Sequence, residues 1–225
     1  MRCLNCHARM FEEIGWSDLF LKRMEDPFCG ECRATLVKIE GVKCEVCSRA
    51  MKEAGICGDC EIWLKHPEYK DVLTSNQSIY QYNPALKDLL KRFKYSGDYA
   101  LAGCFQKELI ELLKPYRKSF IITPLPVSDE RLKERGFNQT EALLDCAKIK
   151  YEILLTRINT ETSQAKKLKS ERHKGDNPFK SIKELNGEKI ILVDDLYTTG
   201  TTLRRVAQVL KQAGAGEVRS ITVGR

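Results

Sequence analysis

The stretch KIILVDDLYTTGTTLRRVAQVLKQAGA, residues 189 to 215, places two acids and four threonines around a single glycine. The apolar run before Asp194 predicts a buried strand, and apolar residues at helical spacing after Thr202 predict a helix. The start of a helix offers unpaired backbone N–H groups and a partial positive charge, which together favour phosphate. Glycine lets the backbone approach a ligand closely, and the threonine hydroxyls add donors. The stretch therefore predicts a phosphate-binding loop.

Asp194 and Asp195 stand at the end of the predicted strand, beside this loop. Two carboxylates there would repel a phosphate unless they contact vicinal hydroxyls or a hydrated cation. A ribose 5-phosphate meets both demands, with its hydroxyls on the acids and its phosphate in the loop. The alternative is a capped helix beside acids that bind nothing. Neither a G-x-x-x-x-G-K-[ST] nor a G-x-G-x-x-G pattern is present, which argues against a P-loop or a dinucleotide fold.

A second group of reactive residues lies at the other end of the chain. Eight of the ten cysteines form four Cys-x-x-Cys pairs: Cys3/Cys6, Cys29/Cys32, Cys44/Cys47 and Cys57/Cys60. Each pair aims two thiolates at one metal, and two pairs complete a tetrahedral zinc site. The sequence thus predicts two structural Zn²⁺ sites. Pairing in chain order gives the shortest loops, although a crossed pairing also fits.

The alternatives for these cysteines are redox dithiols, unrelated buried thiols, or c-type haem attachment at CLNCH, which would use Cys3, Cys6 and His7. Four similar pairs favour zinc over all three. A site of four thiolates leaves no open position for a substrate, so catalysis belongs elsewhere. Cys104 and Cys146 lie in helical apolar patterns and are interpreted as inert core residues.

The chain as a whole has 225 residues, a net charge of +7 and 42% hydrophobic residues, as expected for a globular protein with a packed core. Its first residues lack the apolar segment of a signal peptide, and no run is long enough to span a bilayer. We therefore expect a cytoplasmic protein without membrane insertion, in which the thiols stay reduced. The moderate positive charge is a weak indication of polyanion binding.

Strands and helices alternate after the cysteine pairs. Helices are expected in PALKDLLKRFKY, in ALAGCFQKELIELL, from about Asn138, and after the threonine loop. The expected strands are SIYQYN, SFIITPLPV, YEILLTRI, KIILVDDL and EVRSITVGR. This alternation favours a parallel sheet with helices on its faces, whose ligands bind at the carboxyl ends of the strands. The expected domains are a double zinc ribbon over 1–62, a connector over 63–78 and an α/β domain over 79–225.

Several of these motifs together resemble a known family. ILVDDLYTTGTT is similar to the phosphoribosyl pyrophosphate (PRPP) motif of type I phosphoribosyltransferases. The cysteine pairs, LKRFKYSGDYALA, PLPVSDERLKERGFNQ and this motif, in that order, resemble the ComF/ComFC family of competence-associated proteins over nearly the whole chain. The resemblance implies a type I phosphoribosyltransferase-like parallel sheet with flanking helices and an N-terminal zinc-ribbon domain.

The resemblance also assigns roles to residues. It implies that Asp194 and Asp195 bind the ribose and Mg²⁺-linked water, and that the PRPP 5-phosphate is held by Thr198, Thr199, Gly200, Thr201 and Thr202. In PLPVSDERLKERGFNQ the prolines and Gly136 are expected to shape a turn, from which Arg131 and Arg135 reach the pyrophosphate. A basic helix start is the alternative for these two arginines.

The basic segment 163–179 contains Lys166, Lys167 and Arg172. It is expected either to close over the pyrophosphate as a flexible loop, or to act as a solvated linker or a nucleic-acid contact.

Two classes of function remain after these assignments. In the first, the protein transfers phosphoribosyl from PRPP, with Mg²⁺, to an acceptor. In the second, it is a non-catalytic, single-stranded DNA-binding accessory protein of transformation that works with a cytoplasmic helicase. Lys91, Arg92 and Lys94, among aromatic residues, are the candidate nucleic-acid contacts, with an ordinary amphipathic helix as the alternative.

Overall fold

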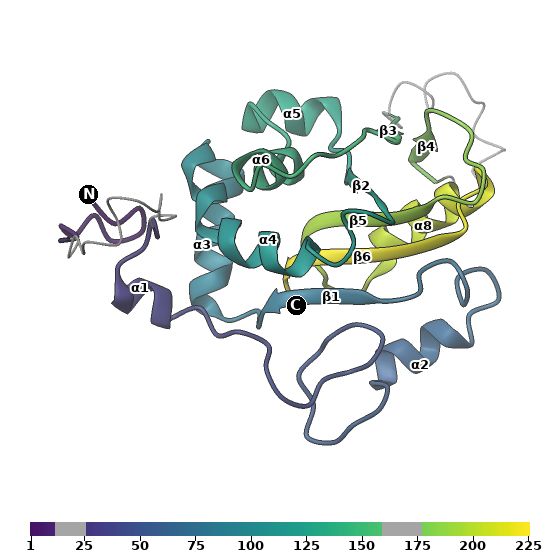
Figure 1. Cartoon of the computed structure of the whole chain (residues 1–225), viewed down its shortest axis with the longest axis horizontal. Helices are drawn as coiled ribbons and strands as arrows, with labels where there is room; N and C mark the ends of the chain where they lie inside the picture. Colours follow the sequence, from purple (N-terminus) through teal and green to yellow (C-terminus); the bar gives the residue numbers. More distant parts are fainter. Residues whose placement is uncertain (12–25, 159–176) are drawn as a thin grey trace, which may run out of the picture.

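The computed structural model describes residues 1–11, 26–158 and 177–225, and its main feature is a parallel sheet (Figure 1). The sheet has the strand order β1-β6-β5-β2, and neighbouring strands pair in parallel. Its strands are β1 (Asn76–Tyr80), β2 (Ile121–Pro124), β5 (Lys189–Leu196) and β6 (Glu217–Gly224). The central strand β5 contains a continuous apolar run from Ile190 to Val193, and β6 is buried along most of its length, because helices cover both faces of the sheet. The predicted parallel α/β fold is confirmed.

Successive residues of β5 face opposite layers. Ile191 and Val193 belong to the apolar core beneath four helical segments, whereas Ile190 and Leu192 belong to the core beneath a fifth. The four segments are α3 (Pro84–Tyr95), η2 (Tyr99–Phe105), α4 (Gln106–Leu113) and α6 (Gln139–Cys146), and the fifth is α8 (Thr201–Gln212). Both cores therefore anchor the strand that carries Asp194 and Asp195.

The helices beside the site begin and end for local reasons. In α3, the Asn83 side chain accepts a hydrogen bond from the Leu86 N–H, and Pro84 occupies the first turn, where its missing N–H costs nothing. In α8, Leu203, Val206 and Leu210 are buried at helical spacing, and Gly200 precedes the first turn with φ 80°. Local sequence features therefore explain where each helix begins.

Three local predictions need correction. First, residues Asp129–Arg135 form a helix, α5, where we expected a turn; Ser128 caps it and Gly136 ends it in the left-handed conformation. Second, ALAGCFQKELIELL is not one helix, because its first part is the 3-10 helix η2. Ser128 and Gly136 are sequence signals for the two ends of α5, but the prolines before the helix favour a turn.

The third correction concerns YEILLTRI. Only β3 (Leu155–Arg157) forms, and it pairs antiparallel with β4 (Phe179–Ser181) outside the main sheet. Leu154 and Leu155 are buried, but Ile153 is 42% exposed, so the segment lacks the two-sided burial of a strand in the parallel sheet. It therefore does not add a strand to the main sheet beside β2, and forms a two-stranded ribbon with β4 instead.

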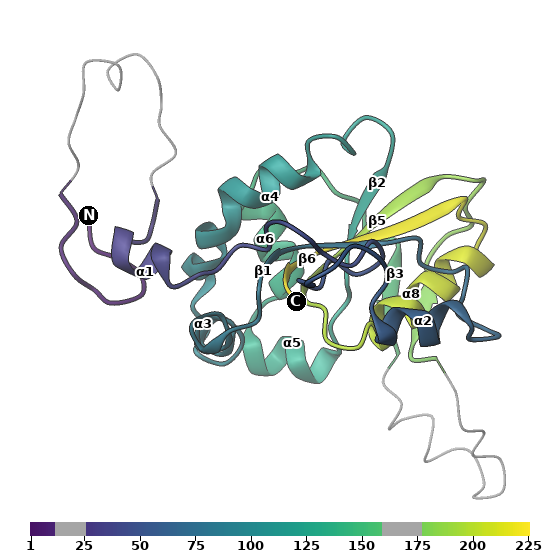
Figure 2. The same ribbon diagram turned by 90° about the horizontal axis from the view of Figure 1, so that it is seen from below.

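The two cysteine-rich parts lie apart. The helix α1 (Gly30–Ala34), beside the first pairs, and the helix α2 (Gly58–Leu64), beside the last pair, are found at opposite ends of the molecule in both views (Figures 1 and 2). Between them the chain runs along β1, where the Ile39 N–H donates to the Ile79 carbonyl. The domain boundaries at 62 and 78 stay predictions.

Candidate functional site

A pocket of about 280 Å³ opens at the carboxyl ends of β2 and β5. It brings together six of the residues that were predicted to bind PRPP: Asp194, Asp195, Thr201, Thr202, Arg131 and Arg135. They come from three elements, since the acids end β5, the threonines begin α8 and the arginines lie on α5. This is the edge at which parallel sheets bind their ligands.

The two acids share a small, partly buried space. The Asp195 N–H donates to the Asp194 Oδ1 atom at 2.8 Å. Lys94, on α3, forms an ion pair with the Asp195 carboxylate, which is 8% exposed. Burial and the adjacent charge of Asp195 raise the pKa of Asp194 well above its usual range. The acid pair therefore favours a bound proton or cation, which would reduce the repulsion between the two carboxylates.

This raised pKa predicts a particular dependence of stability on pH. The folded chain keeps the Asp194 proton at pH values where the unfolded chain has lost it, so the associated stability is fully present below about pH 4 and is lost as the pH rises through the raised pKa. Asp194→Asn removes the carboxylate and keeps an acceptor for the Asp195 N–H. We expect the variant to be more stable than the wild type at pH 8, with no such gain below about pH 4.

Urea unfolding across this pH range measures the effect. Asp88→Asn, which replaces an exposed aspartate on α3, is the control and should run parallel to the wild type. Parallel curves for Asp194→Asn as well would contradict the raised pKa.

The threonine loop meets the pocket through its second half. Thr201 and Thr202 line the pocket as the first residues of α8, and the Thr199 and Thr201 hydroxyls lie 2.9 Å apart. The sequence-predicted residues Thr198, Thr199 and Gly200 form the turn just before them and are not among the lining residues of the unliganded pocket. The arrangement offers the N-terminus of a twelve-residue helix to the pocket.

Five cationic side chains line the pocket, and sequence reasoning missed three of them in this role. Arg131 and Arg135 were expected, and they share a face because they are four residues apart on α5. Lys94, Arg157 and Arg205 are the additional three. Arg205 could have been predicted from the sequence, because it lies one helical turn after Thr201 and therefore on the same face of α8. With five cations and two acids, the pocket suits a ligand that carries several negative charges.

Arg135 and Arg157 are held by their surroundings. The Arg135 guanidinium is buried, donates to Gln139 Oε1 at 2.7 Å and stacks over the Tyr95 ring at 5.4 Å. Burial, together with the positive charge of Arg131, lowers the pKa of Arg157. An anion placed between Arg131 and Arg157 would relieve the repulsion between their guanidinium groups, which supports an anion-binding role.

The candidate nucleic-acid residues on α3 face different partners. Lys91 is exposed, whereas Arg92 donates to the Leu4 carbonyl at 2.9 Å and Lys94 turns to Asp195. They do not make one continuous strip, so DNA contact by this helix stays a prediction. The candidate loop residues Lys166, Lys167 and Arg172 lie outside the described residues, while Pro178 and Phe179, which follow them, line the pocket.

The cysteine pairs group in chain order into two tetrads, which we call the first tetrad (Cys3, Cys6, Cys29, Cys32) and the second tetrad (Cys44, Cys47, Cys57, Cys60). Within each tetrad the sulfur atoms lie within 4.8 Å of one another. Thiolates around one Zn²⁺ stand ~3.8 Å apart, close to the 3.6 Å between the Cys47 and Cys57 sulfurs. Both tetrads fit zinc, and the grouping of Cys3 and Cys6 with a second pair disfavours haem attachment.

Hydrogen bonds support the sulfurs as zinc ligands. The Cys57 N–H donates to the Cys44 Sγ atom at 3.3 Å, and the Arg225 guanidinium donates to Cys47 Sγ at 3.1 Å. Hydrogen bonding from Cys60, aided by the Arg225 charge, lowers the pKa of Cys47 to about 4. Cys104 is buried and Cys146 half-buried, neither belongs to a tetrad, and burial raises the pKa of each. The tetrads are thus built for a metal, and the remaining cysteines are not.

No helix in the described ranges has the length and apolar character needed to cross a bilayer.

Comparison with known proteins places the site in context. Residues 143–224, which include both acids and the threonine loop, match the model of the phosphoribosyl transferase domain. Over 99% of its length the chain is 37% identical to competence protein ComFC of Bacillus subtilis, covering 94% of that protein. It is 36% identical to ComFC of Streptococcus pneumoniae over the full length of both chains. DNA utilization protein YhgH of Salmonella typhimurium is 26% identical over 85% of this chain and 93% of its own length.

Proposed function

Because the chain belongs to the ComF/ComFC family of competence proteins, we propose that it binds PRPP with Mg²⁺ and transfers the phosphoribosyl group to an acceptor in a process linked to DNA uptake. The link to DNA uptake comes from the names of its relatives, and we propose that it acts in the cytoplasm. The observation that carries the proposal is the convergence of an acid pair, a helix N-terminus and five cations on one pocket.

The pocket divides into parts that suit the parts of PRPP. We assign the ribose hydroxyls to Asp194 and Asp195, which accept hydrogen bonds. The 5-phosphate is assigned to the loop Thr198–Thr202, through backbone N–H groups and hydroxyls. The pyrophosphate is assigned to the guanidinium groups of Arg131 and Arg135. Arg157 and Arg205 add positive charge to the same pocket.

The acid pair also fits a magnesium ion. Carboxylate oxygens are the ligands that Mg²⁺ prefers, and the Lys94 ammonium already places one positive charge against Asp195. When bound, the ion would neutralise charge on the pyrophosphate. We propose that Lys94 yields its position beside Asp195 to the ligand, because the carboxylate must be free to accept from the ribose.

The proposed reaction is a displacement at the anomeric carbon. The bond to pyrophosphate breaks with its electron pair on the leaving oxygen, and a lone pair of the acceptor forms the new bond. The ribosyl transition state is cationic, so the protein contributes alignment and neutralisation of the leaving group, without a protein nucleophile. The arginines of α5 would stabilise the leaving group, and the acids would hold the ribose in line.

Calorimetric titration of zinc-loaded protein with PRPP, with and without Mg²⁺, tests the proposal. Two hydrogen bonds to charged groups are worth about 3 kcal/mol together, so Asp194→Ala/Asp195→Ala, which removes both acceptors, should weaken binding at least about a hundredfold. Asp88→Ala should bind as the wild type does. If the folded wild type gives no binding heat with PRPP and Mg²⁺, the proposal fails.

A further inference from the structure

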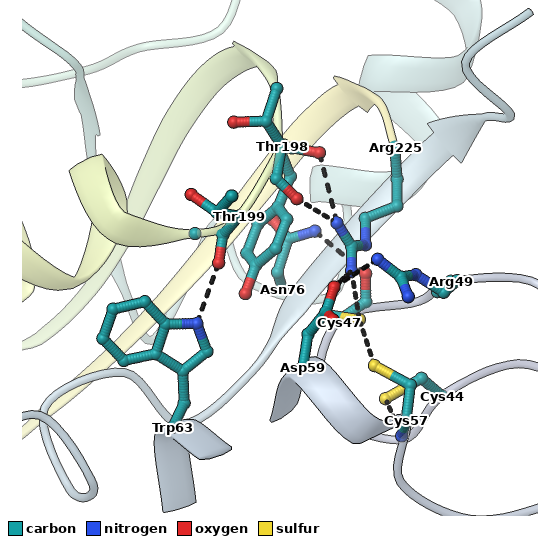
Figure 3. Close-up of polar contacts among 12 residues, drawn as sticks. Cys44, Cys47, Arg49, Cys57, Asp59, Trp63, Asn76, Thr198, Thr199 and Arg225 are labelled. Atoms are coloured by element: carbon teal, nitrogen blue, oxygen red, sulfur yellow. Dashed lines mark hydrogen bonds and ion pairs between the residues drawn. The ribbon is translucent and has the colours of Figure 1, made fainter. Parts of the chain in front are cut away.

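The second tetrad is linked to the phosphate loop through the side chains of Trp63 and Arg225 (Figure 3). Trp63 lies on α2, the short helix that also carries the cysteine ligand Cys60. Its indole Nε1–H donates to the carbonyl oxygen of Thr199 at 2.9 Å. A residue three positions from a zinc ligand therefore holds the backbone of the loop.

Arg225 makes a second link between the same two parts. Its guanidinium donates to the Cys47 sulfur at 3.1 Å and also to the carbonyl oxygen of Thr198. The side chain is 5% exposed, lies 3.8 Å from Asp59 and packs over the Tyr197 ring at 4.5 Å. One buried guanidinium thus contacts a metal ligand and the loop at once, as the hydrogen-bonding groups around a metal site do when they orient its ligands.

A third set of contacts joins the first turn of α8 to α2 beside the loop. The Arg204 guanidinium stacks over the Trp63 ring at 4.6 Å and donates to the Tyr197 hydroxyl at 2.7 Å. Arg204 is 2% exposed and Tyr197 is 2% exposed. The first helical turn of α8 and the helix α2 therefore share one packed unit.

These contacts act on the peptide groups that a phosphate would use. In a trans peptide the carbonyl and the next N–H point in opposite directions. With the Thr198 and Thr199 carbonyls held by Arg225 and Trp63, the N–H groups of Thr199 and Gly200 must point away from the tetrad. Fixed N–H groups in a tight turn form an anion-binding concavity.

We infer that Trp63 and Arg225 are positioning residues that couple metal occupancy of the second tetrad to the shape of the phosphate loop. Zinc in the tetrad fixes α2 and the Cys47 thiolate, these fix the loop carbonyls, and the loop then presents its N–H groups to a phosphate. Coupling of this kind is reciprocal, so a bound phosphate ligand also retains the zinc. The inference rests on the proposed function for the identity of the ligand.

The first tetrad provides an internal reference. In the described ranges, side chains link its segments to α3, β1 and η2: Arg92 donates to the carbonyl oxygens of Leu4 and Asn5, and Arg33 donates to the Tyr80 hydroxyl and the Cys104 carbonyl. Among the residues that the structure describes, no hydrogen bond joins the first tetrad to Thr198 or Thr199. A ligand in the pocket should leave its zinc affinity unchanged.

Pulsed alkylation of the full, zinc-loaded chain in the presence of a chelator, read by mass spectrometry, follows each tetrad separately. We expect saturating PRPP with Mg²⁺ to slow alkylation of the second tetrad at least about fivefold and to leave the first tetrad unaffected. Trp63→Phe removes the N–H donor and keeps a ring, and Arg225→Lys keeps the charge without the fork of donors. Both variants should lose the ligand effect, whereas Arg92→Lys should keep it.

Two measurements separate the possible failures. If PRPP binds the wild type by calorimetry but protects both tetrads equally or neither, the coupling is wrong and the proposed function stands. If PRPP does not bind, hydrogen exchange decides the coupling without a ligand. Amides 198–202 should then exchange faster in Arg225→Lys and Trp63→Phe than in the wild type or Arg92→Lys, and unchanged exchange overturns the inference.

Discussion

Gly200→Ala is expected to abolish measurable PRPP binding and to destabilise the fold by about 3 kcal/mol or more. Gly200 has φ 80°, a left-handed conformation that costs a residue with a Cβ atom about 1–2 kcal/mol. The added Cβ would also lie 2.2 Å from the Tyr197 hydroxyl and 2.3 Å from Arg204 Nη1. Both side chains are buried and joined by a hydrogen bond, so neither can move away from the added Cβ atom without breaking that hydrogen bond.

A matched glycine separates the two causes. Gly187 has φ 84°, but a Cβ there would meet nothing within 4 Å. Gly187→Ala should therefore lose only the conformational cost, about 1–2 kcal/mol, and bind PRPP as the wild type does. Urea unfolding and calorimetry of both variants make the comparison. Equal losses in the two variants would mean that the contact of Gly200 with Tyr197 and Arg204 does not matter.

The parts of the site that could be predicted are those encoded within a short stretch. The strand that ends in Asp194, the loop around Gly200 and the helix after it are consecutive, so their relative placement follows from local pattern and chirality. The cysteine pairs are local as well, and their grouping in chain order follows the shorter loops. For such features, sequence spacing already determines distance in space.

The remaining parts depend on tertiary packing. Lys94, Arg131 and Arg157 come from α3, α5 and β3, and nothing in their local sequences shows that they meet at one strand end. Lys94 is an example: its basic and aromatic neighbours suggest nucleic-acid contact, which stays a prediction, but they do not reveal its ion-pair partner Asp195, about a hundred residues further along the chain. The α3 pattern gave the buried face of the helix but not the partners of its other faces.

The contact between α2 and the loop is the extreme case. Trp63 and Thr199 are separated by 136 residues, and the acceptor is a backbone carbonyl, which has no sequence signature. From the sequence alone, zinc binding by the cysteines and phosphate binding by the threonine loop are predicted as two separate functions. That the two share a hydrogen-bonded contact is visible only in the folded chain.

Loss of the second zinc is expected to damage the protein more than loss of the first. All four cysteines of the second tetrad are buried and belong to the same apolar cluster as Leu192 of β5 and Val206 of α8. In the first tetrad Cys6 is exposed and Cys29 half-buried. Cys60→Ser should therefore lower the Tm of the whole chain by about 10 °C or more, and Cys6→Ser by less than about 5 °C.

Scanning calorimetry with elemental analysis checks this difference. The wild type should contain two zinc ions and each variant one, because the tetrads are separate. A metal bound only by the folded chain adds its binding free energy to folding, and a buried tetrad without metal leaves unpaired thiols inside the core. If Cys6→Ser lowered the Tm as much as Cys60→Ser, the first tetrad would be equally integrated with the sheet. The contact through Trp63 and Arg225 would then be no reason to treat the second zinc as part of the ligand site.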